Sequence, residues 1–276
     1  MELVLVNPIP FVSQVSPMID MHTHLLPGID DGAADWTETL RLARAAAAEG
    51  ITEVVATPHH ANGRDLNPAS GVLELVREAN DRLAAAGIPL TVRPGQEIRV
   101  HDDLLDAWSR GELLALNQSN YVLIELPPDF IPKGMPDLLH ELDMLGLRAV
   151  IAHPERNAEI VRHPERLGEL VEAGAYAQVT AHSLLGGFGK RIERQAWSLC
   201  ERGWIHLVAS DAHHVDRRGF RLLQAYDRIG QELGAVWRQT AENNARRLLI
   251  GGSLDSSPVI HAGERSLWRK ISGIFT

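Results

Sequence analysis

Histidine and carboxylate side chains recur in this chain at the ends of short apolar segments. The segment IDMHTHLLPGIDDG, residues 19–32, places His22 and His24 one residue apart and follows them with Asp30 and Asp31. Successive side chains of a strand point to opposite faces, so two histidines in this spacing face the same side and can bind one metal ion. The Pro-Gly pair after them ends the strand and lets the aspartates turn back toward the histidines. Because surface and core histidines are common, this pair alone does not decide between a metal site and an ordinary packed histidine pair.

Every other apolar segment also ends in a side chain that can bind a metal ion. Runs at 18–22, 53–57, 90–97, 121–126, 148–152, 176–180 and 205–210 predict seven strands. The first run ends in the histidine pair. The residues that end the other six, in chain order, are His59 with His60, Glu97, Glu125, His153, His182, and Asp211 with His213 and His214.

Helical stretches separate the predicted strands. They cover 34–49, 70–86, 101–111, 135–146, 164–173, 189–202 and 218–233, with a further helix at 240–249. This alternation predicts an α/β fold with a mainly parallel sheet, and seven units without a linker favour one closed barrel over residues 18–252. The strand-to-helix loops of such a barrel meet at one end, so the strand-end side chains are expected to lie together there.

The segment before the barrel has a different character. Residues 1–17 are apolar, but Pro8 and Pro10 interrupt them far short of a membrane span, and no basic region precedes the apolar residues. We therefore expect an arm or an extra strand.

Residues 253–276 form a tail after the barrel. Within it, residues 265–275 space apolar side chains along one face of an expected helix, beside the basic residues Arg265, Arg269 and Lys270. Docking onto the protein's own surface and contact with a membrane surface or a partner both fit this pattern.

Composition narrows the classes of function. The formal net charge of -9 gives no basic surface for nucleic acid, which argues against duplex binding but not against a nucleotide-sized substrate. Cys200 is the single cysteine, which excludes an intramolecular disulfide and any cysteine-rich zinc site. A cytoplasmic location is expected.

The mixture of ligands indicates which metals the site takes. Imidazole and carboxylate groups without thiolate favour zinc, manganese or iron over calcium or magnesium alone. The candidates outnumber the ligands of one tetrahedral site, so two or three divalent ions are expected, and clustered ions can activate water and hold phosphate oxygens. His60, His182 and His214 are better explained as groups at the rim of the site or behind its ligands.

Seven motifs in this order resemble the PHP (polymerase and histidinol phosphatase) superfamily. They are IDMHTHLLPGIDDG, ATPHH, GQEI, LIEL, IAHPER, QVTAHSLLGGFG and ASDAHH, and they run from about residue 18 to 250. More narrowly, the chain is similar to the manganese-dependent bacterial protein-tyrosine phosphatases of capsule and exopolysaccharide operons. This resemblance implies a distorted (βα)7 TIM-like barrel with a trinuclear metal centre, in which Mn²⁺ is expected and iron or zinc is an alternative.

The resemblance also assigns residues to roles. The implied phosphate-binding arginines are Arg156 and Arg218, although Arg217 stands beside the second and the two could exchange roles. His182 and His214 occupy positions where the family usually has other residues, and both are left out of the ligand set. The implied metal ligands are His22, His24, Asp31, His59, Glu97, Glu125, His153, Asp211 and His213.

The function implied by this resemblance is hydrolysis of phosphotyrosine on a protein. The implied partner is the phosphotyrosyl tail of a membrane-associated bacterial tyrosine kinase that regulates capsule or exopolysaccharide synthesis. The hypothesis for the reaction is attack by a metal-activated hydroxide, with Asp211 as a ligand and the two arginines on the phosphate. His60 could donate a proton or orient the ester.

Other mechanisms and functions compete with this one. Six residues after Cys200 stands His206, not the arginine that a thiol-dependent tyrosine phosphatase requires, so thiol catalysis is not expected. A PHP phosphomonoesterase acting on a small metabolite such as histidinol phosphate remains an alternative, as does a metal-stabilised scaffold without catalysis. The sequence does not determine the oligomeric state.

Overall fold

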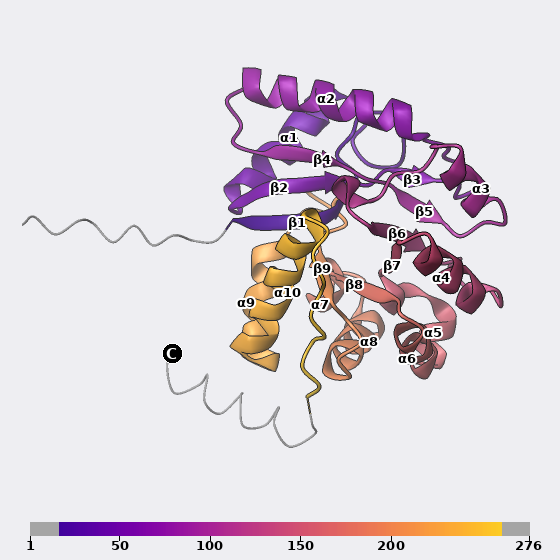
Figure 1. The fold of residues 1–276 in the computed structure, drawn as a ribbon. Coiled ribbons are helices and arrows are strands. Elements are labelled where there is room, and N and C mark those ends of the chain that lie inside the picture. The colour runs from indigo at the N-terminus through magenta and orange to yellow at the C-terminus, as the bar shows by residue number, and fades with distance from the viewer. Residues whose placement is uncertain (1–16, 261–276) are drawn as a thin grey trace, which may run out of the picture.

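The computed structural model describes residues 17–260, in which parallel strands alternate with helices. Figure 1 shows the order of these elements along the chain. The strands are β1 (Met18–Thr23), β2 (Ile51–Ala56), β3 (His59–His60), β4 (Thr91–Pro94), β5 (Glu97–Arg99), β6 (Tyr121–Glu125), β7 (Arg148–Ala152), β8 (Tyr176–Thr180) and β9 (Leu207–Ala209). The α-helices are α1 (Trp36–Ala48), α2 (Ala69–Ala85), α3 (Leu104–Ser109), α4 (Met135–Met144), α5 (Ala158–Arg162), α6 (Glu165–Glu172), α7 (Ala181–Leu184), α8 (Lys190–Glu201), α9 (Leu222–Leu233) and α10 (Ala235–Leu249). Two 3-10 turns complete the set, η1 (Leu116–Gln118) and η2 (Pro154–Arg156).

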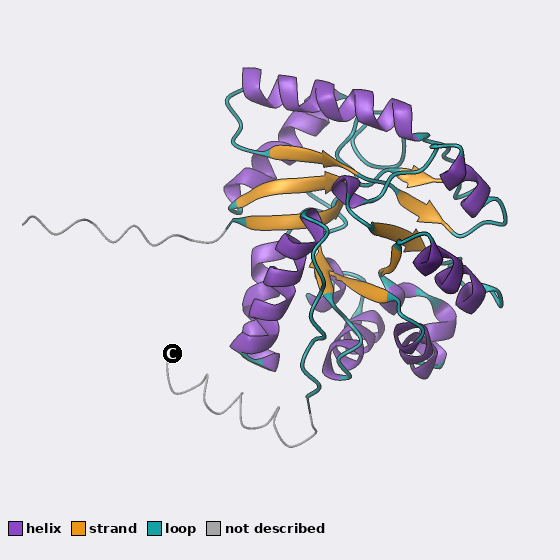
Figure 2. Cartoon of the chain, viewed as in Figure 1, coloured by secondary structure: helices purple, strands orange, loops and turns teal. Residues whose placement is uncertain are grey.

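The strands form two parallel sheets, and the helices lie around them (Figure 2). One sheet has the order β1-β2-β4 and the other β3-β5-β6-β7-β8-β9. A parallel bridge between Thr23 and Ala212 links the end of β1 to the segment after β9. Around this bridge, His24 N donates to Ala212 O at 2.8 Å and Asp211 N donates to His22 O at 2.9 Å. The predicted α/β class with parallel strands is confirmed, and β1 and the end of β9 lie side by side.

One predicted strand is broken in two and another is followed by a short extra strand, neither of which the apolar pattern indicated. The run at 90–97 is β4 followed by β5, because the buried Gln96 side chain bonds to loop backbone: its Oε1 accepts from Leu114 N at 2.5 Å and its Nε2 donates to Asn67 O at 2.6 Å. The run at 53–57 is β2, and β3 follows it after Pro58, which has no backbone N–H for a sheet ladder. These breaks point Glu97 and His59 inward.

The helix predicted over 218–233 begins four residues later than expected. It starts at Leu222, because the amides of His213 and His214 both donate to Arg218 O, at 2.9 and 3.2 Å, and close a turn before the helix. Arg218 consequently lies in the loop after β9 and not in α9. The predicted start was wrong, and the difference places Arg218 at the ends of the strands.

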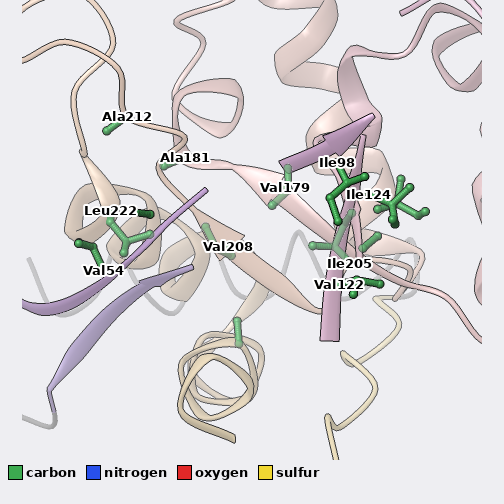
Figure 3. Close-up of a cluster of buried hydrophobic side chains, with 14 of the residues drawn as sticks. Val54, Ile98, Val122, Ile124, Val179, Ala181, Ile205, Val208, Ala212 and Leu222 are labelled. Carbon is green, nitrogen blue, oxygen red and sulfur yellow. The ribbon is translucent and has the colours of Figure 1, made fainter. Parts of the chain in front are cut away.

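The core has two parts because neighbouring strand residues face opposite sides of the sheet. On β6, Val122 and Ile124 belong to the large cluster between strands and helices, whereas Leu123 belongs to a second cluster on the inner face of the strands. Figure 3 shows the large cluster, in which Ile124 lies beside Ile98, its register partner on β5. Burial on both faces fixes the strands that carry the site.

His206 is a buried histidine away from the candidate ligands. It is 4% exposed, its ring packs edge-on against Tyr176, and its Nδ1 accepts a hydrogen bond from Ala177 N at 3.2 Å. Burial lowers the pKa of His206 from 6.5 to about 4. The folded protein therefore holds this imidazole neutral at pH values where the unfolded chain binds a proton.

This histidine predicts a loss of stability in mild acid. The contribution of neutral His206 is fully present above pH 6.5 and decreases as the pH falls toward 4, by up to roughly 3 kcal/mol for a shift of this size. His206→Asn removes the titration and keeps an acceptor for the Ala177 amide. Denaturant unfolding of the metal-free proteins at pH 7 and pH 4.5 should show a smaller difference for the variant than for the wild type. Equal differences would contradict this role of His206.

The flanking segments predicted from the sequence lie largely outside the described residues. Of the arm at 1–17 only residue 17 is described, and the amphipathic segment at 265–275 lies wholly outside the described residues. The described part of the tail, 253–260, has no regular secondary structure, and Ile260 N donates to Glu201 O at 2.8 Å. Within residues 17–260, no helix combines the length and the apolar character that crossing a membrane requires.

Candidate metal centre

Six strands, with the turns after them, and the loop that carries Asp31 bring the predicted metal ligands into one cluster. Nine side chains form four overlapping groups, and within each group the candidate ligand atoms lie within 4.8 Å of one another. The groups are His24, Asp31, His59 and His213; His22, His24 and Asp211; His22, Glu97 and His153; and His59, Glu97 and Glu125. These are the nine residues that the family resemblance implies as metal ligands.

The two histidines of β1 are oriented by hydrogen bonds at their outer nitrogens. His22 Nδ1 donates to Gln178 Oε1 at 3.0 Å, and His24 Nδ1 donates to Asp30 Oδ2 at 2.7 Å. Such bonds leave each Nε2 with a lone pair directed into the cluster. The two Nε2 atoms are only 3.1 Å apart. Burial opposes protonation of His24, but the surrounding carboxylates, Asp30 foremost, outweigh it and raise its pKa well above the usual value, so the site attracts positive charge.

The loop that follows β1 uses its two aspartates differently. Asp30 binds His24 as described, whereas Asp31 Oδ1 lies 3.2 Å from His213 Nε2 and 3.4 Å from His59 Nε2. A Cβ at Gly32 would lie 1.9 Å from His24 O, so only glycine lets this loop pack against the end of β1. The sequence predicted both aspartates near the histidines but not the orienting role of Asp30.

Glu97 lies at the centre of the cluster and faces two sides of it. Its Oε1 is 2.6 Å from His153 Nε2, and its Oε2 is 2.9 Å from His59 Nδ1 and 3.3 Å from His22 Nε2. Despite these short distances, Oε2 of Glu97 and Nδ1 of His59 make no hydrogen bond of suitable geometry among the described residues, and neither does the buried Oδ1 of Asp211. Unpartnered buried polar atoms are costly, and here all three belong to candidate ligands. The residues therefore fit divalent cations.

The charges of the cluster also fit bound cations. Burial raises the pKa of Glu125, and the nearby Glu97 carboxylate raises it further. Burial lowers the pKa of His153 to about 3, so this imidazole is neutral and free to bind a metal. Burial opposes protonation of His59, but Asp31 and Glu97 outweigh it and raise its pKa to about 10. The carboxylates of Asp31 and Glu97 thus attract positive charge to His59, where a cation would be stabilised.

Two candidate ligands have a backbone conformation that is uncommon for residues other than glycine. His153 has φ of 33° and Asp211 has φ of 56°, both in the left-handed region. Non-glycine residues adopt this region at a cost and do so most often at functional sites. The turns after β7 and β9 hold these side chains toward the cluster.

Two arginines lie beside the ligands. Arg156 Nη2 donates to Asp211 Oδ2 at 2.7 Å, and Arg218 Nη2 donates to the same oxygen. Burial opposes ionisation of Asp211, but Arg156, His22 and Arg218 together hold its pKa well below the usual range. Arg218 Nε is buried and has no partner among the described residues. Arg217 is exposed, so Arg218 is the arginine that the loop turns toward the ligands.

A cavity of about 210 Å³ opens next to these groups. Both arginines and three of the candidate ligands line it, together with apolar side chains of the loop after β6 and the end of β7. Its lining residues are His59, Glu125, Leu126, Pro128, Ala152, His153, Arg156, Asn157 and Arg218. A group that enters this cavity meets metal ligands and two guanidinium groups together.

The family model for capsular polysaccharide synthesis, CpsB/CapC, matches residues 18–250. The chain belongs to the CpsB/CapC family. The tyrosine-protein phosphatase YwqE of Bacillus subtilis is 41% identical over 251 residues, which are 91% of this chain and 99% of YwqE. The tyrosine-protein phosphatase CpsB of Streptococcus pneumoniae is 30% identical over 239 residues, 84% of this chain and 98% of CpsB. The predicted resemblance is confirmed.

A solved structure extends this likeness to three dimensions. It comes from work on YwqE of Bacillus subtilis and CpsB of Streptococcus pneumoniae, described as metal-dependent tyrosine phosphatases. It matches with a TM-score of 0.85 and 42% identity over 88% of this chain and 98% of its own. A phosphotriesterase homology protein of Escherichia coli matches with a TM-score of 0.51 and 12% identity, over 83% of this chain and 98% of its own, which shows the fold alone.

Three further histidines of this CpsB/CapC chain, His60, His182 and His214, lie outside the four ligand groups. His60 is buried and its Nδ1 donates to Asn67 O at 2.8 Å. His214 stacks beside His213, with 6.3 Å between ring centroids. His182 Nδ1 is buried without a hydrogen-bond partner in the described structure, and its ring packs on Phe188. Cys200 is fully buried in α8, and burial raises the pKa of its thiol well above the usual value, as expected for an inert cysteine.

Sequence reasoning missed the residues that orient the ligands. Gln178, on β8, contacts His22 from 156 positions along the chain, and only the topology brings the two together. Asp20 Oδ1 accepts from Ser210 N at 3.0 Å and joins β1 to the segment that carries Asp211. The alternation of β1 could have indicated Asp20, because it shares a face with His22 and His24.

Proposed function

We propose that this protein is a metal-dependent phosphatase that hydrolyses phosphotyrosine on a protein. The observation that carries the proposal is the cluster of nine metal ligands beside two arginines at an open cavity. The relatives described above are tyrosine-protein phosphatases. They match 84% and 91% of this chain, and the solved structure has the same fold.

The nine clustered residues would hold two or three divalent ions, with Mn²⁺ as the expected metal. Such ions supply Lewis acidity and a water molecule of lowered pKa as the nucleophile. Glu97 and Asp211 each lie within 3.4 Å of more than one histidine, so both carboxylates would help to hold the ions together with the imidazoles. Asp30 and Gln178 would keep the histidine rings in place.

Arg156 and Arg218 would bind the phosphate of the substrate. A guanidinium group matches phosphate with two parallel hydrogen bonds, and both arginines already point at the Asp211 carboxylate beside the cavity. The unpartnered Nε of Arg218 is available as a further donor. The arginines would also balance the negative charge that develops on the phosphate oxygens during the reaction.

The apolar side chains that line the cavity favour an aromatic ester as the substrate. Leu126, Pro128 and Ala152 provide apolar surface next to the arginines, where the ring of a phosphotyrosine would pack. A tyrosine phenolate, with an ordinary pKa of about 10, is a better leaving group than a serine alkoxide. Hydrolysis of this ester therefore needs little help from a general acid.

We infer that the strands form one distorted (βα)7 barrel over residues 18–252. The β2 and β3 strands are two halves of one barrel strand, as are β4 and β5, and the bridge between Thr23 and Ala212 joins the first strand to the last. This gives seven strands with all the metal ligands at their carboxyl ends, as in other barrel enzymes.

The partner we propose is the phosphotyrosyl tail of a membrane-associated bacterial tyrosine kinase in capsule or exopolysaccharide synthesis. The family description and the names of the relatives support it. We propose a cytoplasmic location, where such a tail would be accessible. Contact of the terminal segment 265–276 with the membrane is part of the same proposal.

The experiment that tests the function compares three substrates. Phosphate release with Mn²⁺ should be at least about tenfold faster, in kcat/KM, from a phosphotyrosyl peptide than from a phosphoseryl peptide or histidinol phosphate. Faster turnover of histidinol phosphate would assign the site to a small metabolite instead. Metal binding without release from any of the three would indicate a scaffold.

A further inference from the structure

Phe188 stands next to both arginines but outside the cavity. The carbon at the centre of the Arg156 guanidinium lies 5.3 Å from the centroid of its ring, and that of Arg218 lies 5.6 Å away. Cations within about 6 Å of an aromatic face are attracted by its negative charge density. Phe188 is not among the residues that line the cavity, so it contacts the guanidinium groups away from the space where a substrate enters.

The two guanidinium groups lie close together, and an aromatic ring that attracts both can stabilise this arrangement. Both donate to Oδ2 of Asp211, which brings two positive groups together on one oxygen. Like charges at this separation repel each other and would spread apart without another restraint. A ring that attracts both groups limits this movement.

The segment that carries Phe188, residues 182–188, is closely packed. The ring packs edge-on against His182, with 5.1 Å between centroids, and Gly187 N donates to His182 O at 2.9 Å. A Cβ at Gly187 would lie 2.0 Å from His182 Cδ2, so a glycine is required for the segment to close over this histidine. His182, which the metal cluster does not use, thus supports Phe188.

The same segment is tied to the turn that holds Arg156. The fully buried Glu155 precedes this arginine, and its Oε1 accepts from Thr180 N at 3.0 Å and from Ser183 Oγ at 2.7 Å. These bonds fix the first turn of α7, from which the chain continues to Phe188. One carboxylate therefore joins the turn that carries Arg156 to the start of the segment that leads to Phe188.

We propose that Phe188 is a positioning residue that holds Arg156 and Arg218 together in the geometry that binds phosphate. This inference rests on the proposed role of the two arginines. The ring preorganises both guanidinium groups before the substrate arrives, so less of the binding energy is lost in ordering them. It acts through the arginines and does not touch the substrate.

The test compares variants that keep or remove the aromatic face. Phe188→Leu keeps an apolar side chain without the face, and Phe188→Tyr keeps the face. Binding of inorganic phosphate to the metal-loaded protein, measured by calorimetry, should weaken about tenfold in the leucine variant and stay within about twofold in the tyrosine variant. KM for a phosphotyrosyl peptide should rise in the same proportion, with a smaller change in kcat.

A second ring–arginine pair supplies the control. The central carbon of the Arg82 guanidinium lies 4.5 Å from the centroid of the Trp36 ring, at the start of α1. Trp36→Leu should leave phosphate binding unchanged. Bound metal and the melting temperature are measured for each variant, and Phe188→Met replaces the leucine variant if that one does not fold.

Two results would overturn the inference. One is unchanged phosphate affinity in the leucine or methionine variant, and the other is an equal loss in the tyrosine variant. Because phosphate binding needs no turnover, this test stands apart from the proposed function. If the wild type binds phosphate but releases none from phosphotyrosine, the proposed function is refuted. The phosphate affinities of the leucine and tyrosine variants would still decide the role of Phe188.

Discussion

Replacing Asp211 with asparagine should abolish phosphatase activity and reduce the amount of bound metal. Asp211 belongs to a ligand group with His22 and His24, and its other oxygen accepts from both arginines. Asparagine has the same shape and tolerates the left-handed backbone of this position, so the change removes mainly the charge. We expect kcat/KM for a phosphotyrosyl peptide to fall by about a thousandfold or more.

A nearby aspartate gives the control for this variant. Asp216 lies in the same loop, is exposed, and pairs only at 3.5 Å with Arg41. Asp216→Asn should change neither activity nor metal content. Steady-state kinetics and elemental analysis measure the activity and the metal content of both variants. Normal turnover with normal metal content in Asp211→Asn would refute the proposed centre.

Replacing Arg156 with alanine should weaken catalysis without loss of metal. The side chain of this arginine lines the cavity and donates to Asp211 Oδ2 at 2.7 Å. The loss of charged hydrogen bonds to the phosphate should lower kcat/KM about 100-fold. Arg156→Lys should restore only part of this loss, because an ammonium group cannot reproduce the two parallel bonds of a guanidinium.

The matched control is an arginine a short distance along the chain. Arg162 is exposed in α5 and its Nε donates to Ala158 O at 2.9 Å, away from the cavity. Arg162→Ala should behave as the wild type. Full activity in Arg156→Ala would remove this residue from the phosphate site, and a loss of bound metal would give it a structural role instead.

The ligand cluster was predictable because it depends on local pattern and one topological rule. His22 and His24 share a face through the period of a strand, and Glu97, His153 and Asp211 each follow an apolar run. Parallel strands then carry all these ends to one place. Nothing beyond the order of elements was needed to expect that they meet.

The supporting contacts were not predictable, because they join residues distant in the chain. Gln178 meets His22 across the sheet, and the Gln96 side chain binds two loops that interrupt a predicted strand. The late start of α9 depends on a backbone turn between His213 and Arg218 that no propensity indicates. Each depends on tertiary packing, which a single sequence does not reveal.

The central claim is that the nine clustered side chains hold the metal ions on which phosphotyrosine hydrolysis depends. The most direct measurement removes bound metal with a chelator, restores Mn²⁺ in steps, and follows metal per chain and phosphate release from a phosphotyrosyl peptide together. Activity should vanish with the metal and return in proportion to it, and saturate at two or three ions per chain. Undiminished release from protein stripped of metal would contradict the account.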